Sequence, residues 1–566
     1  MSLLYGGKTD IDVEKIEFQE ARDHAQLEMP DSIPVIVEEE IFAEKKDLKP
    51  QWSFYRRGLE QRHIQMIALA GTIGTGLFLG SGRALATGGP VGLFLGYLLT
   101  GLLVSGVVIS IAEMSALVPL SGSIIRQAEY FFDPALSFAQ GWNTVYSYSV
   151  GIPAEIVAAG VLIEFWVPSS VVSSAVWITV LGLLTIATNL LFIRVYGEME
   201  FGFAILKILL IVGLIIMGLC IDLGGVSGQP RLGFHYWRDP GPFVQYLSIP
   251  GPLGRFCGFW TTFSNAAYAY SGVEGIANAA AETRNPRRNI PKAAKRIFIR
   301  VLIFYVLSVF VVTLLVPSNS EDLLNAQGTG NAAQSPFVIA ASLAGIKVVP
   351  HIVNAVVLTS AWSAANSGML TSTRTLYGLA REGHAPKFLL WTNRFGIPYV
   401  CVLCVGVFIA LGYMTLSNNA SVVFSWFQDL VSTAVLVQWC IICLVYLRFY
   451  YACQRQKVNR KTELPWAGPF QPYAAWISLL SFGTILLTAG YPVFIKGHWD
   501  TEEFIGAYFN LPLIFGLYFG YKWMKKTKVV GLKEMPVKYY VEIAKENPEE
   551  EERPVKGWSG LSILWT

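Results

Sequence analysis

Four ionisable side chains interrupt otherwise apolar stretches of this sequence: Glu113, Glu155, Lys207 and Glu274. A charged group is costly in apolar surroundings unless it is paired, hydrated or neutralised by a proton. Lys207 is the clearest case, because it lies in the run FAILKILLIV with no local acid. Either its partner comes from another helix, or burial lowers its pKa. All four are candidates for holding or transferring a proton, and structural ion pairing or packing is the alternative for each.

A second candidate site is the glycine-rich stretch ALAGTIGTGLFLGSG at residues 68–82. It does not fit a dinucleotide-binding loop, because no strand precedes it and no βαβ unit surrounds it. Small-x-x-x-small spacing, which lets membrane helices pack closely, accounts for Gly80. It does not account for Gly71, Gly74 and Gly76 together, and this cluster predicts a helix that unwinds at membrane depth.

A similar interruption occurs about two hundred residues later, in the stretch FWTTFSNAAYAYSGVEGIANAAAE at residues 259–282. There Gly272 and Gly275 flank Glu274 in an otherwise apolar and small-residue segment. Transporters built from inverted repeats carry an interrupted helix at corresponding positions of both halves. The two stretches therefore predict two five-helix repeats, each opening on a broken helix.

A broken helix exposes N–H groups that favour an anion and C=O groups that favour an ammonium group. An α-amino acid carries both charges on neighbouring atoms. Backbone from Thr72 to Gly76, with carbonyls near Tyr270 and Ser271, is therefore expected to hold the part that all amino acids share.

The composition supports a polytopic membrane protein, with 53% hydrophobic and 15% charged residues in 566 and a mean hydropathy of +0.46. The net charge of +3 gives no reason to expect nucleic acid as a partner. No apolar run follows Met1, which predicts no cleaved signal peptide. Residues 1–57 are polar and are expected to form a disordered cytosolic tail.

Apolar runs of about 20 residues, long enough to cross a bilayer, recur throughout the rest of the chain. Twelve spans are predicted, at approximately residues 63–84, 90–117, 135–166, 171–193, 198–221, 257–281, 297–317, 350–382, 398–416, 421–449, 473–495 and 504–524. Lys and Arg concentrate in alternate loops and after the last span. This asymmetry predicts that both termini are cytosolic.

Four motifs give the sequence a family resemblance: GTIGTGLFLGSG, AEMSALVPLSGSIIRQAEYFFDPALSFAQGW, AYAYSGVEGIANAAAETRNPRRNIPKAAKR and SAANSGMLTSTRTLYGLAREGHAPKFL. Together they resemble the fungal amino-acid permeases, the yeast amino-acid transporter family of the amino acid/polyamine/organocation superfamily. The resemblance runs from about residue 52 to about residue 525. It implies uptake of amino acids across the plasma membrane, driven by protons.

The implied fold is an all-α polytopic membrane protein with 12 transmembrane helices. Ten of them form a LeuT-like 5+5 inverted repeat with spans 1 and 6 unwound, and two are additional. The expected domains are the tail 1–57, a permease domain 58–525 and a cytosolic C-terminal tail 526–566. Within the permease domain, repeat 1 is expected at about 63–221, repeat 2 at about 257–449 and the extra spans at about 473–524.

The resemblance also implies roles for individual residues. The amides of Thr75 and Gly76 correspond to a site for the substrate carboxylate, the carbonyls of Thr72 and Ser271 to one for the ammonium group, and Tyr268 to an aromatic lid. The full set expected to bind substrate is Gly71, Thr72, Ile73, Gly74, Thr75, Gly76, Tyr268, Ser271 and Asn366. Asn366 belongs to a polar stripe in span 8, for which hydrogen bonding between helices is an equally good account. The set expected in proton coupling or gating is Lys207, Glu274, Glu155 and Glu113, with Lys207 standing where sodium-coupled relatives bind Na⁺.

The function expected from these residues is import of L-amino acids by proton symport with alternating access. The alternatives are an amino-acid sensor, or a permease for γ-aminobutyrate, choline or a polyamine. No catalytic constellation, cofactor or metal site is expected, since the Cys-x-x-Cys pairs at 401/404 and 440/443 lie in apolar spans without a nearby histidine or carboxylate. The expected partners are the amino acid, protons and membrane lipid, and lysines in the tails could accept ubiquitin from a regulatory ligase.

Overall fold

A computed structural model describes residues 74–119, 122–191, 193–226, 230–275, 286–324, 335–393 and 396–549. Within these ranges every regular element is a helix. Three residues expected to bind substrate, Gly71, Thr72 and Ile73, lie outside the described part of the chain.

The helices follow the apolar runs of the sequence. The first half of the chain forms α4 (Thr75–Phe78), α5 (Gly80–Leu117), α6 (Ser123–Phe131), α7 (Pro134–Ile163), α8 (Ser174–Leu191), α9 (Ile193–Asp222), α10 (His235–Arg238) and α11 (Gly251–Ala269). The second half forms α13 (Pro286–Arg300), η3 (Val301–Leu307), α14 (Ser308–Leu315), α16 (Pro336–Leu343), α17 (Val349–Arg381), α18 (Tyr399–Gly406), η6 (Val407–Leu416), α19 (Ala420–Arg455), α20 (Arg460–Glu463), α21 (Tyr473–Thr488), α22 (Thr501–Tyr508), α23 (Asn510–Lys525) and α24 (Val537–Glu546).

Several of these helices are long and apolar enough to cross a membrane. In the described ranges five meet that criterion, Thr75–Leu117, Pro134–Ile163, Glu198–Asp222, Tyr399–Leu416 and Ala420–Arg455, and the pair α22 and α23, bent by 41°, would make six. Shorter apolar helices lie at Ser174–Leu190, Phe304–Leu315 and Tyr473–Thr488. The protein is thus an all-helical polytopic membrane protein, while the number twelve stays a prediction.

The helix α5 contains the end of predicted span 1 and all of span 2, which are separated by a kink at Gly89 and Pro90. Gly89 has φ 74° and ψ 176°, a conformation that favours glycine. A Cβ there would also lie 2.9 Å from the Phe243 Cα and 2.9 Å from the Pro242 carbonyl oxygen. The loop before α11 therefore packs directly on the turn between the two predicted spans.

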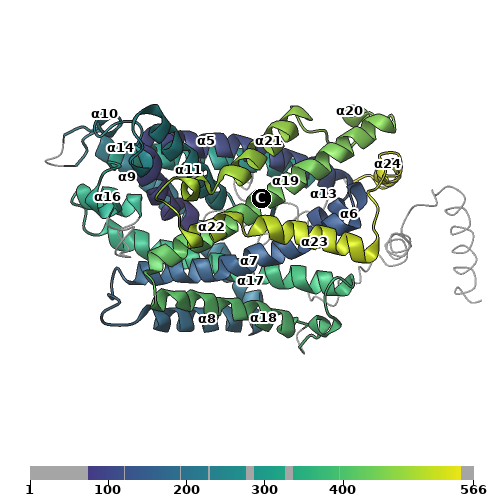
Figure 1. The fold of residues 1–566 in the computed structure, drawn as a ribbon, viewed down its shortest axis with the longest axis horizontal. Helices are drawn as coiled ribbons and strands as arrows, with labels where there is room; N and C mark the ends of the chain where they lie inside the picture. The colour runs from purple at the N-terminus through teal and green to yellow at the C-terminus, as the bar shows by residue number, and fades with distance from the viewer. Residues whose placement is uncertain are drawn as a thin grey trace, which may run out of the picture.

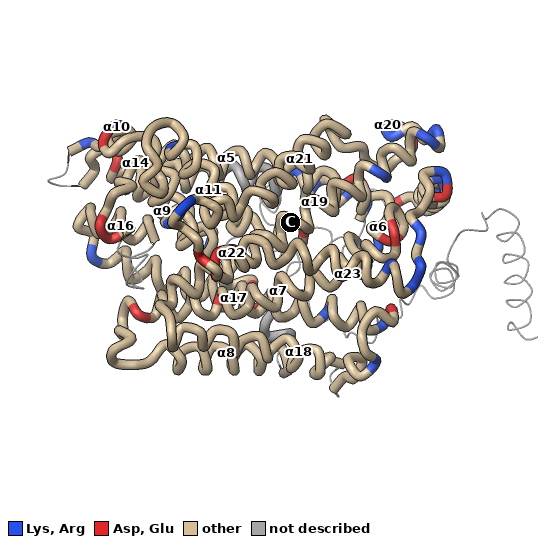
Figure 2. The backbone as a smooth tube through the Cα atoms, in the orientation of Figure 1, with Lys and Arg blue, Asp and Glu red and all other residues tan. Residues whose placement is uncertain are grey.

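The long helices run roughly along the longest axis of the molecule, with α7 and α17 through the middle and α8 and α18 along one edge (Figure 1). The short helices α10 and α16 lie at one end, and α6, α20 and α24 lie at the other. Lys and Arg are most frequent around α20, α24 and the end of α23 (Figure 2). This end is the one predicted to face the cytosol, and it is called the cytosolic end below.

Part of the predicted C-terminal tail folds back on the cytosolic end. The Val530 N–H donates to the Phe132 carbonyl (2.8 Å), and the Gln456 side chain donates to the carbonyl of Met535 (2.8 Å). In α24 the side chain of Tyr540 is buried. Residues 530–546 therefore belong to the packed structure.

Candidate functional site

Two helix ends meet near the middle of the bundle. The helix α4 begins after Gly74, whose backbone is extended (φ −129°, ψ −165°). The helix α11 ends at Ala269, and residues 270–274 form a turn in which Gly272 has φ 90°. Only a residue without Cβ adopts that conformation readily. In the described part of predicted span 1 a helix thus begins at Thr75, and predicted span 6 is interrupted around Ser271.

Gly76 is the point of closest approach between these two elements. A Cβ added at Gly76 would lie 2.7 Å from the Ala269 Cα and 2.9 Å from Cδ1 of Tyr268. At Gly80 the nearest atom would be Nε2 of Gln428, at an ordinary 3.6 Å. Of the two glycines in the small-x-x-x-small pattern, it is therefore Gly76 that lets α4 lie against the end of α11, while a Cβ at Gly80 would make ordinary contacts.

The Glu155 carboxylate joins three elements at this point. Thr75 Oγ1, on α4, donates to both Glu155 oxygens at 2.9 and 3.0 Å. The Tyr268 hydroxyl, on α11, donates to Oε1 of Glu155 at 3.1 Å. Glu155 comes from the middle of α7 and is half-buried. The structure thus brings together three residues singled out from the sequence, and an acid lies directly beside the two helix ends.

Lys207 is fully buried and takes part in a second polar group. Its Nζ donates to Oγ of Ser363 on α17 at 3.1 Å, and the Ser363 hydroxyl contacts the two oxygens of Glu200 at 2.8 and 2.7 Å. Glu200 is also fully buried. The expectation that a partner of Lys207 comes from another helix is confirmed by Ser363 on α17. The acid that this hydroxyl contacts, Glu200, lies on α9 itself.

Three other predicted residues lie outside these two groups of contacts. Oδ1 of Asn366 accepts from Nδ2 of Asn189 at 3.1 Å, which links α17 to α8. Oε2 of Glu274, in the turn after α11, accepts from Nε1 of Trp439 at 3.4 Å. The Ser271 N–H donates to the carbonyl of Tyr268 at 3.1 Å and so closes the turn at the end of α11. The Asn366 contact is of the kind that joins membrane helices.

Glu113 lies near the end of α5 and is fully buried. Its oxygens accept two hydrogen bonds from the Arg460 guanidinium, both at 2.7 Å. They also accept from the Tyr446 hydroxyl at 2.9 Å and from the Gly468 N–H at 2.8 Å. These donors come from α19, from α20 and from the segment that follows α20. Glu113 therefore anchors the loop between α19 and α21 to α5.

We expect the substitution Glu113→Gln to lower stability without changing the pH dependence of activity. It leaves the Arg460 charge without its partner, and breaking a buried pair in this way costs about 3 kcal/mol, the low end of the usual range, because the Arg460 side chain keeps 15% of its surface exposed. The measurement is the apparent melting temperature of the purified protein in detergent. Glu502→Gln, at an exposed position in α22, is the matched control. An unchanged melting temperature with an altered pH profile would instead assign Glu113 to coupling.

An ion pair that the sequence did not suggest lies toward the opposite end. Nη1 of Arg83 on α5 is 3.2 Å from Oδ1 of Asp429 on α19, and both side chains are partly exposed. Each is a charge within a predicted span, which is the signal that could have identified it. The pair connects predicted spans 1 and 10 between the Thr75–Glu155 contact and the outer loops.

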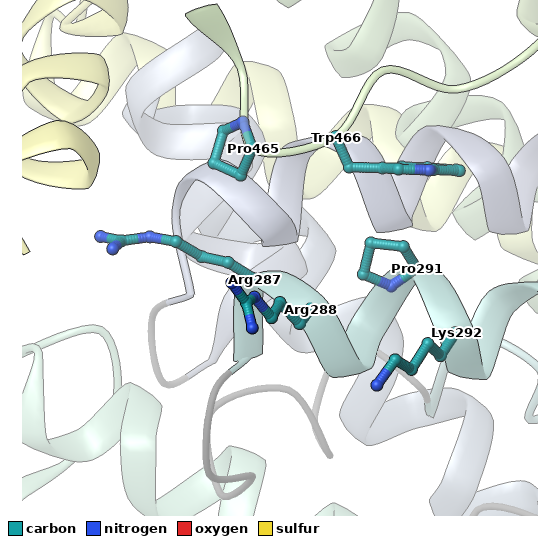
Figure 3. A pocket seen from close by; sticks show the side chains of 6 residues that line it. All are labelled: Arg287, Arg288, Pro291, Lys292, Pro465 and Trp466. Carbon is teal, nitrogen blue, oxygen red and sulfur yellow. The ribbon is translucent and has the colours of Figure 1, made fainter. Parts of the chain in front are cut away.

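A cavity of about 360 Å³ opens at the cytosolic end between α13 and the segment after α20. Figure 3 shows the side chains around it, Arg287, Arg288, Pro291, Lys292, Pro465 and Trp466. None of these belongs to the set predicted to bind substrate. Arg287 points away from Trp466 in this view, and its guanidinium donates to the Asn547 carbonyl beyond α24 at 2.5 Å. The cavity is thus separate from the helix breaks and lies next to the packed C-terminal segment.

Comparison with known proteins finds similarity to one family over nearly the whole membrane region. The model of the amino acid permease family matches residues 63–534. The proline-specific permease of Saccharomyces cerevisiae is 40% identical over 480 residues, which cover 83% of this chain and 76% of that protein. The dicarboxylic amino acid permease of the same yeast is 37% identical, with 89% and 83% covered. Its lysine-specific permease is 36% identical, with 85% and 77% covered.

Proposed function

This chain belongs to the amino acid permease family, and on that premise we propose that it imports L-amino acids together with protons across the plasma membrane. Membership makes it a transporter and not an enzyme. The proposal extends this to a LeuT-like fold of twelve spans, with two inverted five-helix repeats and both termini in the cytosol. The observation that carries it is the Glu155 carboxylate, which lies against both helix breaks.

The substrate is proposed to bind where the two helix ends meet. In α4 the Leu77 N–H donates to the Gly74 carbonyl at 3.3 Å. Thr75 and Gly76 lie in the first turn of this helix, where backbone N–H groups can donate to a carboxylate. The carbonyl of Ser271 lies in the turn after α11 and can accept from the ammonium group. Thr72 and the other residues before Gly74 are proposed to complete the site.

Proton coupling follows from the position of Glu155. An ionised Glu155 would repel a substrate carboxylate bound at the start of α4, whereas a protonated Glu155 would not. Substrate is therefore proposed to bind best after Glu155 has taken up a proton from outside. The separation of Arg83 from Asp429, which joins α5 to α19 on that side, is proposed to open the path to the site.

The side chain of the substrate is proposed to be neutral. The three relatives named above are described by substrates that differ in charge, so similarity alone does not select one. At the broken helices, Tyr268 and Phe424 lie edge to face with their ring centres 6.1 Å apart, which provides an apolar wall. A second carboxylate on the substrate would lose hydration against this apolar wall at an energetic cost, and this disfavours dicarboxylic amino acids.

The test is uptake by yeast cells that lack their own amino-acid permeases. We expect cells expressing this chain to accumulate radiolabelled L-proline or L-alanine against a gradient, faster at pH 5 than at pH 7, with L-glutamate and L-lysine taken up poorly. A protonophore should abolish the accumulation. Binding of these amino acids without accumulation would point to a sensor and contradict the proposal.

A further inference from the structure

Glu200 is a fully buried carboxylate whose place on α9 puts it between Lys207 and the cytosolic end. It precedes Lys207 by seven residues. Seven residues are nearly two helical turns, so both side chains share one face and Glu200 lies roughly 10 Å closer to the start of α9. The other end of α9 leads to α10, which lies with α16 at the opposite end of the bundle (Figure 1). The start of α9 thus points toward the cytosol.

The hydroxyl of Ser363 connects the two charged groups. Lys207 can only donate, so Ser363 Oγ accepts from Nζ at 3.1 Å. The one hydrogen of the Ser363 hydroxyl is then directed at the carboxylate of Glu200, at 2.8 and 2.7 Å. The hydrogen bonds therefore run in one direction, from Lys207 through Ser363 to Glu200.

We propose that Glu200 receives the coupled proton from Lys207 through Ser363 and is the group from which it leaves toward the cytosol. This inference rests on the proposed function, because it requires that a proton accompanies the amino acid. In the transfer, an N–H bond of the Lys207 ammonium breaks as an O–H bond forms at Ser363. The original Ser363 O–H bond breaks as an O–H bond forms at Glu200. The products are a neutral amine, an unchanged hydroxyl and a neutral acid.

The transfer fits the apolar surroundings of the three residues. A buried ammonium and a buried carboxylate are both costly, and moving one proton between them removes both charges. Glu155 on α7 is a second carboxylate whose charge acts on Lys207. The helices α8, α14 and η3, which pack against α9, carry no Asp, Glu, Lys, Arg or His within their described ranges. On α17, which also packs against α9, the basic side chains nearest in sequence on the cytosolic side begin at Arg374, eleven residues after Ser363.

The experiment uses the full-length protein in proteoliposomes that contain a pH-sensitive dye. It compares Glu200→Gln, Ser363→Ala and the matched control Glu198→Gln, an exposed glutamate two residues earlier on α9. Two quantities are measured with the amino acid that the wild type accumulates best: internal acidification on adding substrate, and exchange of labelled for unlabelled substrate. Exchange needs binding and alternating access but no net release of the proton.

We expect Glu200→Gln to lose substrate-driven acidification at least tenfold while keeping exchange within about twofold of the wild type. Ser363→Ala should show the same separation, and Glu198→Gln should behave as the wild type in both assays. The proposal is overturned if proteoliposomes with Glu200→Gln acidify as those with the wild type do. It is also overturned if both variants lose exchange and acidification together, or fail to fold, since Lys207, Ser363 and Glu200 then have a structural role. A wild type that exchanges substrate without acidification contradicts the proposed symport itself, and this outcome is recognised before any variant is compared.

Discussion

Gly76→Ala is expected to reduce amino-acid uptake at least tenfold. The added methyl group would lie 2.7 Å from the Ala269 Cα and 3.1 Å from the Ala269 N, both backbone atoms that cannot move by changing a rotamer. The end of α11 must therefore move away from α4. Overpacking of this kind costs about 1–3 kcal/mol, and about 1.4 kcal/mol is already a tenfold change in an equilibrium. The cost falls on the contact between α4 and the end of α11.

The measurement is the initial rate of uptake, divided by the amount of protein at the cell surface. Gly80→Ala is the matched control, because it adds the same group one turn later, where the nearest atom belongs to the flexible Gln428 side chain. It should keep most of the wild-type rate. Equal rates for the two variants would show that close contact between α4 and α11 does not limit transport.

The contrast between these glycines shows where a sequence pattern stops being informative. Residues four apart share one face of a helix, so Gly76 and Gly80 are equivalent in a small-x-x-x-small pattern. Which of them touches a neighbour depends on where the two helices approach most closely. That point is set by the three-dimensional arrangement of α4 and α11, which lie nearly two hundred residues apart in the chain.

The helix interruption around Ser271 could be predicted because its cause is local. Gly272 adopts a positive φ that other residues avoid, and a glutamate follows two residues later, so both composition and backbone preference oppose a continuous helix. The family was also predictable, since its motifs extend over most of the chain, and the comparisons confirm it. The interruption in span 1 stays a prediction, because the structure describes this span only from Gly74 onward.

The polar contacts between helices were predictable only in part. Glu155, Lys207 and Glu274 were identified because a charge within an apolar span is a strong local signal. Glu200 was missed because it lies at the edge of the predicted span, where an acid is normally solvated. Its spacing of seven residues from Lys207 was a usable signal, but the bridging Ser363 lies 156 residues further along the chain and could not be assigned to the pair.

Glu155→Gln is expected to remove concentrative uptake and the pH dependence of substrate binding. The amide keeps the size of the carboxyl group and can still accept from Thr75 and Tyr268, so the contacts at 2.9 and 3.1 Å are expected to remain. It has no charge at any pH and therefore resembles the protonated acid permanently. Substrate should bind as well at pH 7 as at pH 5, whereas in the wild type binding should weaken as the pH rises and Glu155 ionises.

The measurement combines binding of the labelled substrate to purified protein at the two pH values with accumulation in cells at pH 5. Glu164→Gln, at the end of α7 and away from both helix breaks, is the matched control and should keep the wild-type values. Accumulation by Glu155→Gln at the wild-type level would show that the proton is carried elsewhere, for example by the Lys207–Ser363–Glu200 group alone. Weak binding at both pH values would instead mean that the carboxylate is needed in its charged form, as a direct partner of the substrate ammonium group. The experiment therefore determines which charge of the amino acid interacts with Glu155. If it is the carboxylate, protonation of Glu155 is needed before the substrate can bind. If it is the ammonium group, the proton and the substrate compete for Glu155.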